Sequence, residues 1–264
     1  MKHKNDGFTL LEMCIVIIII GLVVGAIFTT RTLVRAAQLQ NLLAEYDTYI
    51  KAVNEFKDKF LALPGDMNDA TPMWGDEGDC AAPIYTNIPH ILTCDGDGNG
   101  TIGSSDTSAN LSNSKEWFRA WQHLNNSGFI AQKFTGIQGI DGPTEAVPGQ
   151  NVPMSTILGT GWTLMYYLQS ANNANFWGGQ YGHILAMGGF STNTYTIAPS
   201  LAPGEALSID QKIDDGNPGL GFVRAWRSAI LPGCTTDTGT ALSQTYVSTN
   251  DASIKCSLVF ILGF

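Results

Sequence analysis

The chain has 264 residues and a formal net charge of −9, with 14 lysines and arginines against 23 aspartates and glutamates. This acidic balance, with no basic cluster outside the N-terminal segment, argues against a nucleic-acid-binding protein. The length suits one extended helix plus one soluble domain of about 200 residues, which is enough to bury a core of its own.

An unbroken apolar segment at the N-terminus is the first predicted element. It follows a short polar leader with two lysines and runs from Phe8 to Phe28 with a single acid, Glu12. An apolar run of about 20 residues can cross a bilayer as a helix. A lone carboxylate near the centre of a span costs on the order of 2.5–3.5 kcal/mol, so it indicates a function. A secretory signal peptide cleaved after Ala26 and a plain membrane anchor are the alternatives, and neither accounts for Glu12.

The hexapeptide Gly7-Phe8-Thr9-Leu10-Leu11-Glu12 resembles the processing motif of type IV prepilins and of the pseudopilins of type II secretion. The resemblance implies that a prepilin peptidase cleaves between Gly7 and Phe8, and that Phe8 is then N-methylated. It also implies that Glu12 is the assembly acid, which pairs with the Phe8 amine of an adjacent subunit. Such pairing neutralises two charges that would be costly alone in a medium of low dielectric constant.

The same resemblance implies a single-pass inner-membrane precursor, with the leader (residues 1–7) in the cytoplasm, a transmembrane helix (residues 8–28) and the globular domain outside. The implied partners are copies of the chain and other pilin-like subunits in a helical filament, the prepilin peptidase and methyltransferase, and the inner-membrane assembly platform. The mature chain would then reside in an extracellular pilus or a periplasmic pseudopilus. Arg31 and Arg35 lie just beyond the span, on the side opposite the leader lysines. The distribution of positive charge alone therefore does not decide the orientation of the span.

Residues 29–63 are predicted to continue the helix as an amphipathic segment that ends at Pro64-Gly65. We expect its apolar stripe to pack on the globular domain; a free coiled coil is the alternative. No proline interrupts the helix, unlike in many type IV pilins, so local melting at Gly21 or Gly25 in a filament is left open. The stripe comprises Leu39, Leu42, Tyr46, Tyr49, Val53, Phe56, Phe60 and Leu63.

Residues 64–264 form the predicted exported domain. Residues 64–113 are rich in loops, and Asn113 with Glu116 forms a capping-box pattern. A short helix should follow, bury Trp117, Trp121 and Leu124, and end before Gly128. A second helix is expected at 205–214, and strands at 162–168, 183–186, 195–198, 220–226 and 257–262. The predicted fold class is therefore α+β and pilin-like, with the long helix packed on a mainly antiparallel sheet.

The stretch from Asp95 to Asp106 has the pattern of a calcium-binding loop. Oxygen-bearing side chains occupy its first, third, fifth and twelfth positions, a glycine is sixth and an apolar residue is eighth. Aspartate at the twelfth position resembles the dockerin variant of the EF-hand loop, although no clear helices flank it. An ordinary turn rich in Asp, Asn and Gly is the alternative. We expect a structural Ca²⁺ ion with the ligands Asp95, Asp97, Asn99, Thr101 and Asp106.

A second acidic stretch contains Asp210, Asp214 and Asp215. It is interpreted as a helix that ends in a tight turn, with a second metal site as the alternative.

Of the five cysteines, Cys14 is expected to be a small buried residue of the apolar run. In an exported domain the other four indicate two disulfides, and four cysteines allow three connectivities. Local pairing is the simplest, and closing a loop of about 15 residues is worth roughly 3 kcal/mol in the chain-entropy model. A C-terminal disulfide loop is similar to that of many type IV pilins. The two local pairs would be Cys80 with Cys94, and Cys234 with Cys256.

No catalytic signature is found in the sequence. The four histidines are scattered, and there is no nucleophile elbow, phosphate loop or dinucleotide fingerprint. We therefore predict that the chain is not an enzyme but a structural subunit of a type IV pilus-like filament. The alternatives are a pseudopilin of a type II secretion system, and a minor pilin or membrane-tethered calcium-dependent adhesive module. The role of the filament is left open.

Overall fold

The computed structural model describes residues 8–78, 80, 85–103, 115–167, 175–227, 229–236, 244–247 and 250–264. The chain divides into two compact units, residues 1–41 and residues 42–264. The described part of the first unit is almost entirely the beginning of one long helix, α1 (Leu10–Phe60), whose later turns belong to the second unit. Over the part of the chain that the structure describes, no helix has both the length and the apolarity that crossing a membrane requires.

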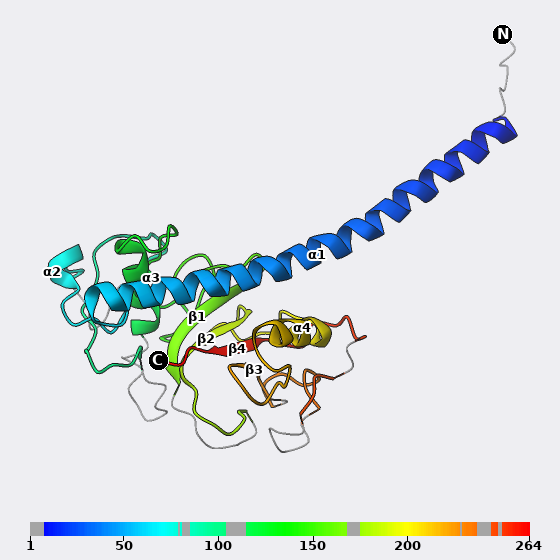
Figure 1. Ribbon diagram of the computed structural model, residues 1–264. Helices are drawn as coiled ribbons and strands as arrows, with labels where there is room; N and C mark the ends of the chain where they lie inside the picture. The colour runs from blue at the N-terminus through cyan, green and yellow to red at the C-terminus, as the bar shows by residue number, and fades with distance from the viewer. Residues whose placement is uncertain are drawn as a thin grey trace, which may run out of the picture. The chain divides into compact units, whose positions relative to one another are not determined.

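The second unit is built on a four-stranded antiparallel sheet with the strand order β1-β2-β4-β3 (Figure 1). The last strand of the chain lies between β2 and β3, so the C-terminal segment completes the sheet. In the described part of this unit, three further helices accompany it. The strands are β1 (Thr160–Tyr167), β2 (Gly182–Gly189), β3 (Val223–Ala225) and β4 (Leu258–Ile261), and the helices are α2 (Thr71–Trp74), α3 (Lys115–Asn126) and α4 (Pro203–Ile213).

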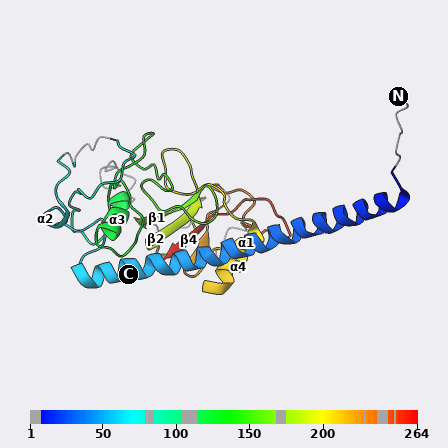
Figure 2. The ribbon, with the colours of Figure 1, turned by 90° about the horizontal axis from the view of Figure 1, so that it is seen from above.

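Within the second unit α1 runs beside the sheet (Figures 1 and 2), and its apolar stripe is covered there: Leu42, Val53 and Phe56 are buried, and Tyr46, Tyr49 and Phe60 are half-buried. The Tyr49 ring packs edge-on against Trp121 of α3 at 5.0 Å and against Trp162 of β1 at 5.9 Å between centroids. Tyr46 lies 4.8 Å from Phe260 of β4. The α+β organisation expected from the sequence is confirmed, with the amphipathic half of the helix packed on the domain.

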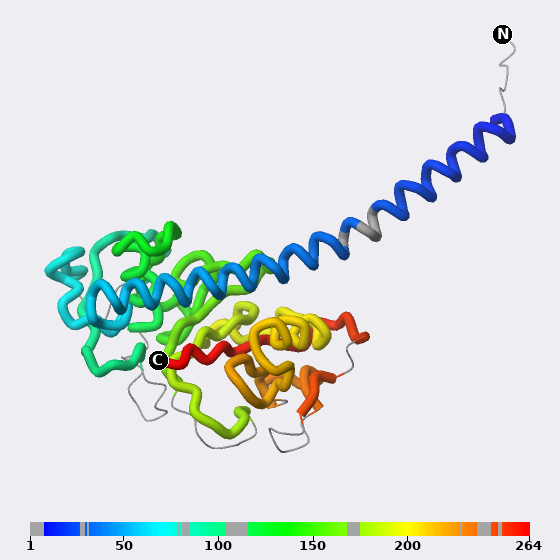
Figure 3. Tube along the Cα trace, in the orientation of Figure 1, coloured from blue at the N-terminus to red at the C-terminus, as the bar shows by residue number. Residues whose placement is uncertain are grey.

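Helix α1 ends at Phe60, earlier than the expected end at Leu63. Leu61 adopts a φ of 54°, in the left-handed region, which stops the helix before Pro64 is reached. Its side chain is left 91% exposed. The C-terminal residue, Phe264, lies beside the last turns of α1, where the Lys57 ammonium group is 5.0 Å from its ring centroid (Figure 3).

Most expected elements of the domain are found with slightly different ends. Helix α3 buries Trp117, Trp121 and Leu124 as predicted, while Asn113 of the predicted capping box lies outside the described residues. The strand predicted at 195–198 is wrong, since only an isolated bridge joins Gly189 and Ala198. Within the predicted stretch the Thr196 N–H donates to the side-chain hydroxyl of Thr163 on β1 at 3.2 Å, and not to a main-chain carbonyl as in a strand ladder.

The structure joins Cys80 to Cys94 and Cys234 to Cys256, in agreement with local pairing. The Cα atoms of the two pairs are 5.7 and 5.0 Å apart. Cys14 is a free cysteine and is exposed in the single chain, so the burial expected for it is not supplied by the chain itself.

Candidate functional site

The predicted calcium loop folds as a series of turns stabilised by its own side chains. Asp97 Oδ1 accepts a hydrogen bond from the Asn99 N–H at 3.0 Å, and Asn99 Oδ1 accepts one from the Thr101 N–H at 2.8 Å. Asp95 makes a different contact: its carboxylate accepts from the Thr71 N–H at 2.7 Å and from the Thr71 hydroxyl at 3.0 Å, at the start of α2. Asp106 lies outside the described residues.

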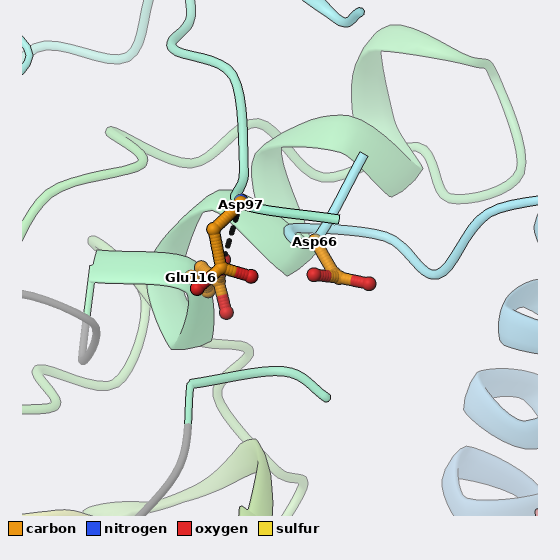
Figure 4. Close-up of side chains that lie close together, drawn as sticks. All are labelled: Asp66, Asp97 and Glu116. Carbon is orange, nitrogen blue, oxygen red and sulfur yellow. Dashed lines mark hydrogen bonds between the residues drawn. The ribbon is translucent and has the colours of Figure 1, made fainter. Parts of the chain in front are cut away.

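Three carboxylates come together beside this loop (Figure 4). Asp66 follows the end of α1, Asp97 belongs to the loop, and Glu116 lies in the first turn of α3. Each offers an oxygen atom, and these oxygens all lie within 4.8 Å of one another. Asp97 is exposed, whereas Asp66 and Glu116 are buried. Of the two predicted carboxylate ligands that the structure describes, Asp95 and Asp97, this group contains Asp97.

The two buried carboxylates of this cluster hold the loop in place through its backbone. Asp66 accepts hydrogen bonds from the N–H groups of Asn99 at 3.0 Å and Gly100 at 2.9 Å. Glu116 accepts from the N–H groups of Asp97 at 3.1 Å and Gly103 at 2.5 Å. Burial raises the pKa of Asp66 to about 6 and that of Glu116 to about 7, outweighing these hydrogen bonds, which act in the opposite direction.

The described part of the loop, residues 95–103, is also held by contacts near its beginning and at Ile102. Cys94, immediately before it, is disulfide-bonded to Cys80. Ile102, the apolar eighth residue of the pattern, is fully buried, and its N–H donates to His183 Nε2 at 3.3 Å. The position of the carboxylate cluster is therefore set by the disulfide, the core and the sheet together.

A cavity of about 440 Å³ adjoins the loop. Asp66, Gly98 and Gly100 line one part of it, and Lys57 and Phe264 line another. This volume has room for several water molecules next to the Asp66 carboxylate.

The second acidic group, Asp210, Asp214 and Asp215, likewise brings its oxygens within 4.8 Å of one another. Asp210 accepts from the Tyr246 hydroxyl at 2.9 Å, and Asp214 accepts from the Val223 N–H at 3.1 Å. These contacts connect the end of α4 to the segments that follow it. The sequence interpretation, a helix ending in a turn, agrees with the end of α4 at Ile213.

At the N-terminus, Thr9 and Glu12 form a reciprocal capping box. The Thr9 N–H and hydroxyl donate to Glu12 Oε2 at 2.8 and 2.9 Å, and the Glu12 N–H donates to Thr9 Oγ1 at 3.3 Å. This pairing satisfies backbone donors of the first turn and sets the start of α1 at Leu10. Phe8 precedes the helix and is 85% exposed, and Gly7 lies outside the described residues.

Residues 2–28 match a family model, described as the prokaryotic N-terminal methylation motif. The chain has a prepilin-type N-terminus. The match supports an N-terminus of the type IV prepilin and pseudopilin type, the kind that prepilin peptidase processes. No curated protein and no solved structure matches the chain.

Three residues of the groups described above, Thr9, Asp66 and Glu116, were not assigned these roles from the sequence. Thr9 could have been found, because Thr-x-x-Glu before an apolar run is the capping-box pattern. Nothing in the sequence near Asp66 or Glu116 predicts that they lie beside the loop at 95–103, because only the tertiary fold brings them there. Cleavage between Gly7 and Phe8 stays a prediction.

Proposed function

We propose that this chain is a structural subunit of a type IV pilus-like filament. The observation that carries the proposal is the N-terminal methylation motif at residues 2–28. The motif supports processing by prepilin peptidase and pilin-type assembly. A pseudopilin of a type II secretion system is the second candidate, because the same motif serves both kinds of protein.

The first unit supports assembly through its apolar surface. The large apolar side chains of α1 between Leu10 and Val24 are exposed in the single chain. Covering apolar surface is favourable by about 25 cal/mol per Å². We propose that residues 8–28 are covered first by the inner membrane, as a single-pass precursor with the globular domain outside the cytoplasm, and then by other subunits in the filament core.

Glu12 supports a defined contact between subunits. Cleavage after Gly7 would create an amine at Phe8, directly before the capping box. Thr9 already holds the Glu12 carboxylate at this end of the helix. We propose that the amine of an adjacent subunit pairs with Glu12, since two opposite charges that lose water together must pair to avoid a large desolvation cost.

The N-terminus and intact mass of the protein test this function. They should be measured in two fractions, the sheared cell surface and washed membranes. We expect a chain that begins at N-methylated Phe8 in the sheared fraction. The same mature chain confined to membranes would support the pseudopilin instead. A chain that starts after Ala26, or an uncut chain, would contradict both.

We also propose that the globular domain binds one structural Ca²⁺ ion. The supporting observation is that Asp66 and Glu116 join Asp97 of the calcium-pattern loop in one group of hard oxygen donors. Ca²⁺ takes six to eight oxygen ligands, so loop oxygens of Asn99 and Thr101 and water from the adjoining cavity would complete the set. When bound, the ion supplies positive charge that links the segment after α1, the loop and α3.

A further inference from the structure

The calcium-pattern loop contains the only Asn-Gly dipeptide of the sequence, Asn99-Gly100. Both residues are exposed. Gly100 has a φ of +85°, and a Cβ added to it would meet nothing within 4 Å. Because glycine has no side chain, its backbone nitrogen is the least hindered of all residues. The amide side chain of Asn99 and the backbone nitrogen of Gly100 therefore stand next to each other on exposed residues of the loop.

The side-chain carbonyl of Asn99 is polarised by Thr101. The Thr101 N–H donates to Asn99 Oδ1 at 2.8 Å, and the Thr101 hydroxyl donates to the same oxygen at 2.5 Å. A backbone N–H can only donate, so the contact itself identifies this atom as the oxygen of the amide. Two donors on a carbonyl oxygen stabilise the negative charge that develops when a nucleophile attacks its carbon.

The neighbouring nitrogen has a proton acceptor in place. The Gly100 N–H donates to Asp66 Oδ2 at 2.9 Å. A carboxylate at hydrogen-bonding distance can take the proton of a nitrogen as that nitrogen attacks. The structure therefore places all three groups that the reaction needs side by side. The nucleophile is Gly100 N, the proton acceptor is Asp66, and the polarised carbonyl is that of the Asn99 side chain.

We propose that Asn99 is a site of deamidation through a succinimide, with Gly100 N as the nucleophile and Asp66 as the acceptor of its proton. A bond forms between Gly100 N and Asn99 Cγ. The proton passes through Asp66 to the leaving amine as the Cγ–Nδ2 bond breaks, and ammonia departs. Water then opens the ring at Cγ to give aspartate, or at the main-chain carbonyl carbon to give isoaspartate. One ammonia leaves and one water enters, with no other reactant.

The product changes the charge of the loop. Asn99 Nδ2 now donates to Asp97 Oδ2 at 2.8 Å. Deamidation replaces that donor with an oxygen of a carboxylate, so a hydrogen bond becomes a contact between two like charges. The modified loop therefore carries one more negative charge beside Asp97. This charge should strengthen cation binding to the loop and destabilise the loop when no cation is bound.

The chain supplies a matched internal control. Asn217 Oδ1 accepts a hydrogen bond from the Gly219 N–H at 2.9 Å, two residues ahead, as Asn99 does from Thr101. The residue after Asn217 is Pro218, which has no N–H and cannot act as the nucleophile. Asn217 therefore forms the same kind of turn as Asn99 but cannot form a succinimide.

The test is a time course of peptide mapping by mass spectrometry on the full-length protein in detergent, with a chelator and at neutral pH. We expect the mass gain of amide-to-acid conversion at Asn99, as aspartate and isoaspartate, with Asn217 unchanged. Asp66→Asn should slow the conversion on the order of tenfold. This is less than the roughly 100- to 10,000-fold that a positioned acid–base group contributes in an enzyme, because Asp66 is not part of an enzyme active site. Thr101→Val should slow it as well, and it leaves the Asp66 contacts intact.

The same chain unfolded in denaturant provides the reference rate for the dipeptide alone. Conversion in the folded protein at least as fast as in the unfolded chain supports the proposal. An Asn99 that stays unmodified while the unfolded chain reacts would overturn it, because the fold would then protect the residue. Equal rates in folded wild-type protein and in both folded variants would overturn the roles of Asp66 and Thr101.

Discussion

Gly96 has no room for a side chain, because a Cβ there would meet the backbone of Gly65 and Asp66. Its N–H donates to the Met67 carbonyl at 2.7 Å, which attaches the calcium-pattern loop to the segment after α1. We expect Gly96→Ala to destabilise the protein by about 1–3 kcal/mol or more, since backbone atoms cannot move aside as side chains do. Chemical denaturation of the full-length protein measures this change.

Gly100→Ala is the control for that substitution. At Gly100 the positive φ disfavours alanine by roughly 1–2 kcal/mol, but a Cβ meets nothing within 4 Å. It should therefore leave the loop attached at Met67. If Gly96→Ala proved no more destabilising than Gly100→Ala, the close approach of the loop to Asp66 would be wrong.

The candidate metal ligands show what sequence reasoning could and could not reach at this scale. Asp97 was predicted, because alternating short oxygen-bearing side chains in a glycine-rich loop are a local pattern. Asp66 and Glu116 were not, because nothing in the sequence relates a residue after α1 to the first turn of α3. Asp95, also predicted as a ligand, accepts a hydrogen bond from Thr71 of α2, a helix that was not expected from the sequence.

Asp210 predicts a pH dependence of stability. Burial raises its pKa to about 7, more than the hydrogen bonds from Tyr246 and Gly216 lower it. An aspartate in the unfolded chain has a pKa of about 3.9, so between about pH 4 and pH 7 the folded state binds more protons than the unfolded state. The free energy of unfolding should therefore fall as pH rises through this window. Asp210→Asn should remove that part of the slope, as denaturation at a series of pH values would show.

Asp251 serves as the control for this pH effect. The hydrogen bond from Lys255 lowers the pKa of its carboxyl below the ordinary value. Its contribution is therefore lost only as the pH falls below about 4. Asp251→Asn should leave the slope between pH 4 and 7 unchanged, and an unchanged slope in Asp210→Asn would refute the assignment to Asp210.

At the scale of elements, the carboxylate cluster joins three parts of the domain that a cation would hold together. We expect Ca²⁺ to raise the melting temperature of the wild-type protein, because binding to the folded state alone adds about 2.7 kcal/mol at 100 times the dissociation constant. Glu116→Gln should abolish most of this shift, since a neutral amide is a weaker ligand for a hard cation. Thermal unfolding with Ca²⁺ or with chelator measures it.

Asp214→Asn tests whether the Ca²⁺ effect belongs to this cluster. Asp214 lies in the other acidic group and accepts backbone hydrogen bonds after α4. The Ca²⁺-dependent shift should survive in this variant. A shift that persists in Glu116→Gln and disappears in Asp214→Asn would move the proposed ion to the second group.

The elements themselves were largely predictable, because their periodicity is a local property. Helix α1 and the strands β1, β2, β3 and β4 follow from apolar spacing and from the Gly and Pro breaks around them. The stop of α1 at Phe60 was not, since it depends on the backbone angle of Leu61. The strand order β1-β2-β4-β3 could not be predicted from the sequence either, because the last strand lies between two earlier ones and no local pattern indicates this.

At the scale of the whole molecule, function depends on whether Glu12 acts within one chain or between chains. Within the chain it caps α1 through Thr9, a role worth about 0.5–2 kcal/mol at a helix end. Between chains it would neutralise the amine of Phe8. The two roles predict different outcomes, because a cap can be replaced by other local hydrogen bonds whereas a charge pair needs its carboxylate.

We therefore expect Glu12→Ala and Glu12→Gln to leave cleavage after Gly7 intact and to block filament assembly. Gln retains the capping geometry and loses only the charge, so it separates the two roles. Thr9→Val, which removes the Oγ1 contacts and keeps the Glu12 charge, should assemble. The measurement compares the mature chain in membranes with the yield of sheared filaments. Normal filament yield from Glu12→Gln would count against charge pairing, and loss of cleavage in both Glu12 variants would place the role of Glu12 in processing instead.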